Sequence, residues 1–198
     1  MKKLFFALLL VLLGAPTLAD PLNEAIVQRI EKSDTLRGEF SQQKQLAILP
    51  QPIKSSGSFV YQRQLGLLWQ IQSPLQSRTL FDQQGIHNLN QHDTTPSGAA
   101  QGAMQLFSQL FFALISTDLS QLAQHFEING ENRPEAWRLT LTPKPGDVNK
   151  VIKTLQLQGD RQLQQVIFTD INGDQTTIEF HNQSSTPLNR EEKQRFAR

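Results

Sequence analysis

The clearest pattern in the chain is an alternation of apolar and polar side chains between residues 59 and 72. Six apolar residues in this segment are odd-numbered: Phe59, Tyr61, Leu65, Leu67, Trp69 and Ile71. Four even positions carry glutamine: Gln62, Gln64, Gln70 and Gln72. A period of two indicates strands with one buried face. We therefore predict two antiparallel strands joined by a turn near 64–66, the second ended by Pro74.

Shorter runs with the same period occur on both sides of this hairpin. Before it, three apolar residues share one face of a strand that Pro50 ends: Phe40, Leu46 and Ile48. After it, two short strands are expected near 78–81 and 86–89. Beyond residue 125, apolar residues again alternate in short runs bounded by turn residues: Phe126, Ile128, Trp137, Leu139, Leu141, Val151, Leu155, Leu157, Val166, Phe168, Ile178 and Phe180. This spacing predicts an antiparallel meander of eight to eleven strands in all.

Helical spacing occurs at the start of the mature chain and in its middle. Residues 22–31 follow the pattern of an amphipathic helix, and residues 99–114 form a broad apolar stripe that extends around more than one side. Asp118 is an expected N-cap for a second short helix through 119–123. The polar tail is compatible with a short helix that packs Phe196, or with a frayed end.

These elements predict a mainly β fold in which helices cover a twisted antiparallel sheet. A sheet face rich in Trp, Phe and Leu is not stable in water, yet the helices are few and short. Either the sheet closes on a solid core, or it curls around a cavity that the helices cover.

The N-terminus has the pattern of a secretory signal peptide. Lys2 and Lys3 precede an apolar stretch from Leu4 to Leu13, and Ala19 ends a cleavage pattern. The apolar stretch is shorter than the roughly 20 residues of a membrane-spanning helix. We therefore expect residues 1–19 to be removed and residues 20–198 to form one domain in the periplasm. Because no cysteine is present, disulfides and a lipid-modified N-terminal cysteine are excluded.

Composition argues against several classes of function. Cleavage would change the formal charge from +1 to −1, which excludes the basic surface typical of nucleic-acid binding. The four histidines are scattered, and His87 with His92 and Asp93 is better explained by a solvated loop than by a metal site. No nucleophile elbow or phosphate-binding loop occurs. We expect no metal, no cofactor and no catalysis.

Several short motifs, taken together, resemble the LolA family of periplasmic lipoprotein carriers. They are Phe40-x-Gln42-x-Lys44, Gly57-Ser58-Phe59-Val60-Tyr61-x-Arg63, Trp69 with Pro74, Phe111 to Ile115 with Asp118, Phe126-x-Ile128, and Leu139 to Lys144. The matches cover most of residues 34–180 in the family's order, and only their joint occurrence is specific.

The resemblance implies an unclosed barrel of about eleven strands, with a helical lid over a cavity for acyl chains. It also implies a monomeric carrier that receives lipoprotein from an inner-membrane ABC transporter and delivers it to an outer-membrane receptor. The expected cavity residues are Phe40, Phe59, Tyr61, Leu67, Trp69, Ile71, Trp137, Leu139, Phe168 and Phe180. The expected lid contacts are Phe107, Leu110, Phe111 and Leu114. The transport interpretation requires room for an alkyl chain beneath residues 99–114.

Arg63 is the most informative polar residue in this comparison. Like Phe59 and Tyr61 it is odd-numbered, so a strand that continued through position 63 would place its guanidinium on the apolar face. The family's matching arginine resembles a latch that hydrogen-bonds the lid backbone and keeps the cavity closed. The alternative is that Arg63 lies at a strand end and extends to solvent.

Two departures from the family limit what the resemblance implies. Leu67 replaces a frequent aromatic residue, and a short tail from Pro187 to Arg198 replaces a longer C-terminal segment with a final strand. The second departure leaves the cargo and the receptor open, and another lipid is possible. Two further readings remain: a structural or interaction module with a solid core, and an enzyme on the same scaffold.

Overall fold

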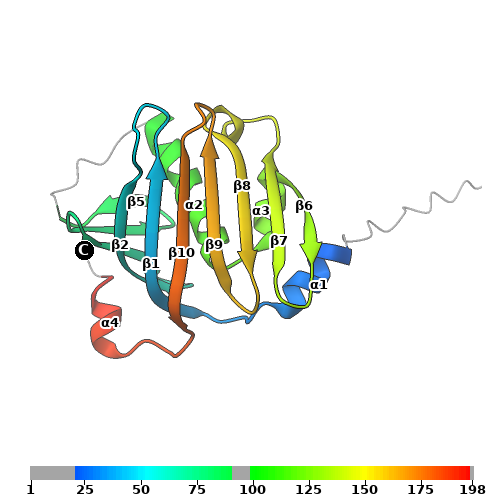
Figure 1. Ribbon diagram of the computed structural model, residues 1–198. Helices are drawn as coiled ribbons and strands as arrows, with labels where there is room; N and C mark the ends of the chain where they lie inside the picture. Colours follow the sequence, from blue (N-terminus) through cyan, green and yellow to red (C-terminus); the bar gives the residue numbers. More distant parts are fainter. Residues whose placement is uncertain (1–20, 91–98, 197–198) are drawn as a thin grey trace, which may run out of the picture.

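The fold is one open antiparallel sheet with the two central helices, α2 (Ala99–Ile115) and α3 (Leu119–His125), on one of its faces (Figure 1). The computed structural model describes residues 21–90 and 99–196, so the expected signal peptide lies outside the described residues. Ten strands are present in the described chain: β1 (Thr35–Gln45), β2 (Ile53–Gln62), β3 (Gly66–Ser73), β4 (Ser77–Asp82), β5 (Gly85–Asn88), β6 (Phe126–Asn132), β7 (Trp137–Pro143), β8 (Ile152–Gly159), β9 (Leu163–Asp170) and β10 (Gln175–Ser184). The predicted fold class is confirmed, with ten strands where about eleven were expected.

The strand order is β5-β4-β3-β2-β1-β10-β9-β8-β7-β6. The sheet therefore consists of two meanders, β1 to β5 and β6 to β10, which are joined where β1 pairs with β10. In that pair Phe40 lies opposite Phe180. Because β5 and β6 are at opposite edges, the sheet remains unclosed.

The helices are α1 (Pro21–Arg29), α2 (Ala99–Ile115), α3 (Leu119–His125) and α4 (Arg190–Gln194), with a short 3₁₀ turn η1 (Val148–Lys150). Helices α2 and α3 follow β5 in the sequence and lie behind the sheet in the view of Figure 1. We call residues 99–125, which contain these two helices and their connecting turn, the lid.

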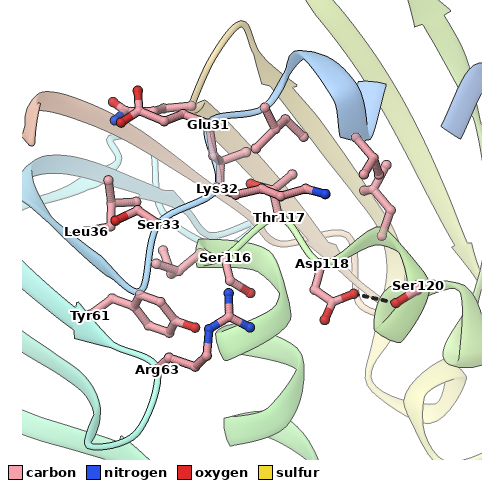
Figure 2. A pocket seen from close by; sticks show the side chains of 16 residues that line it. Glu31, Lys32, Ser33, Leu36, Tyr61, Arg63, Ser116, Thr117, Asp118 and Ser120 are labelled. Atoms are coloured by element: carbon pink, nitrogen blue, oxygen red, sulfur yellow. Dashed lines mark hydrogen bonds between the residues drawn. The ribbon is translucent and has the colours of Figure 1, made fainter. Parts of the chain in front are cut away.

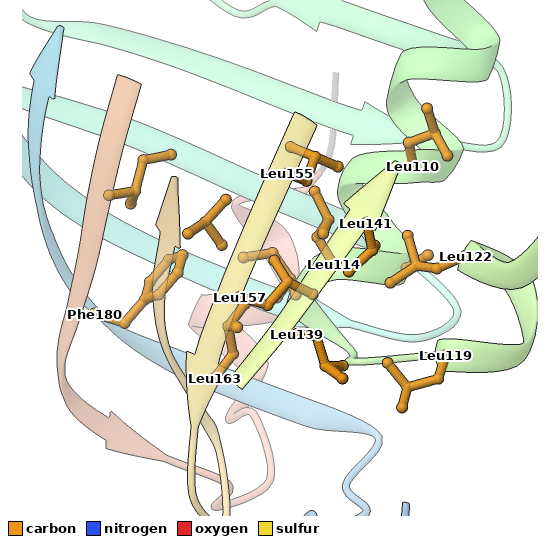
Figure 3. Close-up of a cluster of buried hydrophobic side chains, with 14 of the residues drawn as sticks. Leu110, Leu114, Leu119, Leu122, Leu139, Leu141, Leu155, Leu157, Leu163 and Phe180 are labelled. Atoms are coloured by element: carbon orange, nitrogen blue, oxygen red, sulfur yellow. The ribbon is translucent and has the colours of Figure 1, made fainter. Parts of the chain in front are cut away.

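The core lies between the lid and the sheet. Leu110, Leu114, Leu119 and Leu122 of the lid lie close to leucines of β7 and β8 in Figure 3, and all belong to one buried cluster. The strand residues in this cluster alternate along each strand, as in the buried-exposed pattern of Trp137 to Leu141. The period of two thus places one apolar face of the sheet under the lid.

The first strand is shorter than its sequence pattern predicts. Strand β1 ends at Gln45, so Leu46 and Ile48 lie in the β1–β2 turn, and Ile48 is 87% exposed. The amide of Leu49 donates to the carbonyl of Leu46 over 3.0 Å, which closes a turn before Pro50. The prediction that Ile48 belongs to the buried face is wrong. The alternation of apolar and polar residues in the sequence continues beyond Gln45, which is the last residue of β1 that is paired with another strand.

The C-terminal tail ends in a helix packed on the protein, the first of the two predicted alternatives. The side chain of Asn189 accepts from the Glu192 amide, and the Glu192 side chain accepts from the Asn189 amide, which forms a capping box. Phe196 and Leu188 are buried against Leu68 and Leu80 in a second, smaller cluster. Since Leu68 and Leu80 are even-numbered, this cluster lies on the sheet face opposite the lid.

Candidate functional site

The ten side chains predicted to line a cavity come together on the sheet face beneath the lid. Eight of them are buried, and Ile71 and Phe168 are partly buried against the same cluster. The cluster also contains the lid residues Leu110 and Leu114, with Phe111 packed against it. Phe107 belongs to α2, but its side chain lies outside the described residues.

Aromatic rings fill the centre of this face. Trp69 is stacked on Phe40, with ring centroids 3.8 Å apart, and meets Phe111 of the lid edge-on at 5.3 Å. Phe59 contacts Phe180 edge-on at 5.4 Å. In this conformation the space between α2 and Trp69 is therefore occupied by the protein's own side chains.

Open space occurs instead at the C-terminal end of α2. A pocket of about 360 Å³ lies between α1, the segment that precedes β1, the end of β2 and the turn between α2 and α3 (Figure 2). Its apolar lining comes from Val27, Ile30, Leu36, Tyr61, Ile115, Leu119 and Leu163. Its polar lining comes from Glu31, Lys32, Ser33, Arg63, Ser116, Thr117, Asp118, Ser120 and Gln162. The pocket is amphiphilic, and we call it the lid-end pocket.

The turn between the lid helices is fixed by hydrogen bonds that follow from its sequence. Thr117 has a φ of +49° and ends α2, while the amide of Asp118 donates to the Ala113 carbonyl over 2.8 Å. This pairing is the Schellman motif. The carboxylate of Asp118 then caps α3 by accepting from the Gln121 amide at 3.1 Å. The predicted N-cap is confirmed, and α2 and α3 are held as one unit.

Arg63 lies one residue beyond the end of β2, at the edge of the lid-end pocket. Its Nε donates to Oδ1 of Asp34 over 2.7 Å, and its amide donates to the Asp34 carbonyl over 2.9 Å. The hydrogen bond that Arg63 donates to Asp34 raises the already high pKa of Arg63. The side chain is 59% exposed, and within the described residues no hydrogen bond joins it to the lid backbone. Figure 2 shows its guanidinium pointing toward Ser116 at the end of α2.

Tyr61 connects the apolar and the polar parts of the same pocket. Its ring meets Phe112 of the lid edge-on at 5.6 Å. Burial raises the pKa of the Tyr61 hydroxyl, while the positive charge of Arg63 and a hydrogen bond with Ser116 lower it. Burial is the larger effect, so the hydroxyl is held in its neutral form.

A second pocket, of about 200 Å³, lies on the other side of the β2–β3 turn. It is lined by residues 63–66, by residues 82–84 and by Phe112. Arg63 lines both pockets, so it lies between them at the end of the lid. Phe112 of the lid contacts Tyr61 and also lines this second pocket.

Apart from Arg63, the polar residues of the lid-end pocket were not predicted from sequence as part of a site. Asp34 and residues 31–33 precede the first strand without a motif, and Asp118 was identified only as a helix cap. The charge of Arg63 was a signal for a nearby carboxylate, but the identity of that carboxylate depends on the β1–β2 pairing.

Other chemically active groups have structural explanations. His87 is buried in β5, so the prediction of a solvated loop is wrong for this residue. Its Nε2 lies 3.0 Å from Oδ1 of Asp82, and this oxygen also accepts from the amides of Gln84 and Gly85 in the β4–β5 turn. Among the described residues, no group of three or more His, Cys, Asp or Glu side chains could hold a metal ion. His92 lies outside the described residues. No helix in the described part of the chain is long and apolar enough to cross a membrane.

Comparison with known proteins gives a family match over most of the chain. The family model for the outer membrane lipoprotein carrier protein LolA matches residues 31–194. No curated protein matches the sequence. A solved structure of a LolA superfamily protein from Nitrosomonas europaea is 8% identical, covers 86% of this chain and 94% of that chain, and has a TM-score of 0.44.

Two other solved structures are similar to a comparable degree. The MucA/MucB complex from Pseudomonas aeruginosa is 14% identical, with a TM-score of 0.47, and the match covers 87% of this chain and 60% of that chain. A putative outer membrane lipoprotein-sorting protein domain from Vibrio parahaemolyticus is 8% identical, with a TM-score of 0.40, and the match covers 88% of this chain and 95% of that chain.

Proposed function

The chain belongs to the LolA family of outer membrane lipoprotein carrier proteins, and we propose that it is a periplasmic carrier. In this role it shields the acyl chains of a lipoprotein, or of a related lipid, during transfer from the inner to the outer membrane. The proposal includes export, cleavage of the signal peptide after Ala19, and a single monomeric domain from Asp20 to Arg198. Binding and release require no catalysis, so the carrier is not an enzyme.

The observation that carries this proposal is the apolar contact between the lid and the sheet. Leu110, Phe111 and Leu114 pack on the aromatic face around Trp69. An alkyl chain offers the same kind of surface, so it can replace these lid contacts without leaving polar groups unpaired. Each methylene that leaves water contributes about 0.8 kcal/mol, which makes a long acyl chain a strong competitor for the lid.

The lid-end pocket is the proposed entrance. Its apolar lining, which includes Leu36, Ile115 and Leu163, continues toward the buried face. Its polar lining suits a lipid headgroup. Its volume of about 360 Å³ is near the lower end of the roughly 300–1,000 Å³ of ligand pockets. A full acyl chain therefore requires the lid to move away from the sheet.

Arg63 is the proposed latch of this movement. Its ion pair with Asp34 holds the guanidinium at the pocket edge, pointing toward the end of α2. The helix C-terminus carries partial negative charge, so a nearby cation favours the closed lid. Cargo or a partner protein that attracts Arg63 away from this position would favour opening.

The proposed partners follow from the family. An inner-membrane ABC transporter donates the cargo and an outer-membrane receptor accepts it. The short tail forms α4 on the face opposite the lid, where Glu192 pairs with Arg37.

One observation favours a second candidate, a structural or interaction module. The stack of Phe40 on Trp69 and the contact of Trp69 with Phe111 fill the centre of the face, as in an ordinary core. In that case the lid would remain closed, and the chain would act through its surface.

Lipid binding separates the two candidates. Native mass spectrometry of the mature protein, and titration with a fluorescent acyl probe, should detect a bound lipid in the carrier. Leu36→Trp, which fills the lid-end pocket, should weaken probe binding at least tenfold. Gln72→Trp on an exposed strand position is the matched control and should bind normally. A protein that binds neither lipid nor probe would be the interaction module.

A further inference from the structure

Exposed apolar side chains are concentrated at one end of the sheet. Within the described residues, seven large apolar side chains are exposed, and six of them share this end: Ile48, Leu49, Ile53, Leu75, Val151 and Ile171. Ile48 is 87% exposed and Leu75 is 81% exposed, so neither contributes to the core. We call these six residues the apolar rim. The seventh, Leu65, lies in the β2–β3 turn at the opposite end.

The strand order explains why distant parts of the sequence meet at the rim. Four connections leave the sheet at this end: the β1–β2, β3–β4, β7–β8 and β9–β10 turns. Each joins neighbouring antiparallel strands, and the strands are consecutive across the sheet from β4 to β7. The four connections therefore form one row.

Hydrogen bonds join three of the four connections in this row. The amide of Ala47 donates to Oδ1 of Asp174 over 2.9 Å, which joins the β1–β2 and β9–β10 turns. The amide of Ile171 donates to the carbonyl of Val151 over 3.2 Å, which joins the β9–β10 turn to the β7–β8 connection. These three connections thus form one continuous surface, and the β3–β4 turn with Leu75 is next to it in the strand order.

Lysines surround the apolar rim, and its carboxylates are already engaged. Five exposed lysines lie on the same connections or on the adjoining strand ends: Lys44, Lys54, Lys144, Lys150 and Lys153. Asp174 accepts from Ala47, Asp170 accepts from the amides of Asn172 and Asp174, and Asp147 pairs with Lys150 at 2.7 Å. In the described chain, Lys44, Lys54 and Lys153 form no ion pair, and the five lysines outnumber these three aspartates, so the rim has excess positive charge.

We propose that the apolar rim docks on the surface of an anionic lipid bilayer. Its apolar tips enter the headgroup region, while the flanking lysines contact lipid phosphates. A protein partner fits less well, because lysine is depleted from protein interfaces, whereas lysines beside apolar tips suit a membrane boundary. The inference does not depend on the cargo, since it concerns the end of the sheet opposite Arg63 and the lid-end pocket.

The absence of cysteine allows this surface to be probed one position at a time. The variants Ile48→Cys, Leu75→Cys and Ile171→Cys are labelled with an environment-sensitive fluorophore in the mature protein. Glu135→Cys, at an exposed position in the β6–β7 turn at the opposite end, is the matched control. Each is titrated with vesicles of phosphatidylcholine alone or with one third phosphatidylglycerol.

The expected result is a blue shift of the label at the three rim positions with anionic vesicles, and none at position 135. Removing charge with Lys54→Gln and Lys153→Gln should weaken vesicle binding about fivefold per lysine, with less effect at high salt. No shift at the rim, or an equal shift at both ends, would overturn the proposal. A shift that depends on protein concentration without vesicles would overturn it in favour of self-association.

Discussion

The rings of Phe40 and Trp69 are stacked, with centroids 3.8 Å apart and planes inclined by 23°. Trp69 also contacts Phe111 of the lid, so one indole belongs both to the core of the sheet and to the closed lid. Any guest that enters beneath α2 has to replace the second contact while the first remains. Trp69 therefore contributes both to the stability of the core and to the closed position of the lid.

Replacing Trp69 with alanine should destabilise the protein strongly. The substitution removes a buried ring from the centre of the aromatic cluster, and such changes cost about 3–5 kcal/mol. Urea unfolding of the mature protein measures this loss. Leu75→Ala is the control, because Leu75 is exposed and its removal should change stability by no more than about 0.5 kcal/mol. Equal effects of the two substitutions would contradict the described core.

Tyr61 should titrate above the normal tyrosine pKa. It is the only tyrosine in the chain, so phenolate absorbance reports this residue alone. Burial raises its pKa in the folded state above the value of about 10 in the unfolded chain. The folded state therefore binds more protons above pH 10, and this contribution to stability is present below that pH and lost as the pH rises through the folded pKa.

Removing the nearby cation should shift the same titration further upward. Arg63 lowers the pKa of Tyr61, so Arg63→Leu should move the phenolate midpoint to higher pH. Arg138→Leu, at an exposed position on β7, should leave the midpoint unchanged. An unchanged midpoint in Arg63→Leu would show that the guanidinium does not act on the Tyr61 hydroxyl.

Arg63→Leu should also release bound lipid faster while leaving the fold intact. The ion pair with Asp34 is largely exposed, and such pairs contribute about 0–1 kcal/mol, so the unfolding midpoint should change little. The same range corresponds to an off-rate up to about fivefold higher for a fluorescent acyl probe. Asp34→Asn should act in the same direction, because it frees the guanidinium from the pocket edge. An off-rate equal to that of the unmodified protein would discard the latch.

Gly57→Ala should disturb the pairing of β2 and β3. A Cβ atom at position 57 would lie 1.9 Å from the carbonyl oxygen of Gln70, which is too close without a shift of one strand. Overpacking of this kind costs about 1–3 kcal/mol, to be measured by urea unfolding. Ser58→Ala at the next position is the control and should be nearly neutral.

The sheet could be predicted because each strand has one buried face. The alternation of odd and even positions assigned Phe59, Tyr61, Leu67 and Trp69 to one face, and the structure places all four in one buried cluster. The same rule gave a wrong prediction for Ile48, because the alternation continues into a turn after the backbone pairing has ended. Hydrophobic periodicity does not report where a ladder of hydrogen bonds stops.

The polar half of the candidate site could not be predicted in this way. The residues around Arg63 come from three connections, which meet only because β1 pairs with β2 and the lid crosses the sheet. Arg63 has the parity of Tyr61, but it follows the last residue of β2 and is turned outward to Asp34. Such contacts depend on the topology of the chain, which local sequence patterns do not contain.

The open sheet has a mechanical consequence for the lid. Strands β5 and β6 form its two free edges, and the polypeptide that links them directly is the one that carries α2 and α3. Helix α2 packs on β4 and β5, and α3 packs on β6, so the two helices together contact both edges of the sheet. A change in the distance between these edges would therefore alter the packing of the helices on at least one of them.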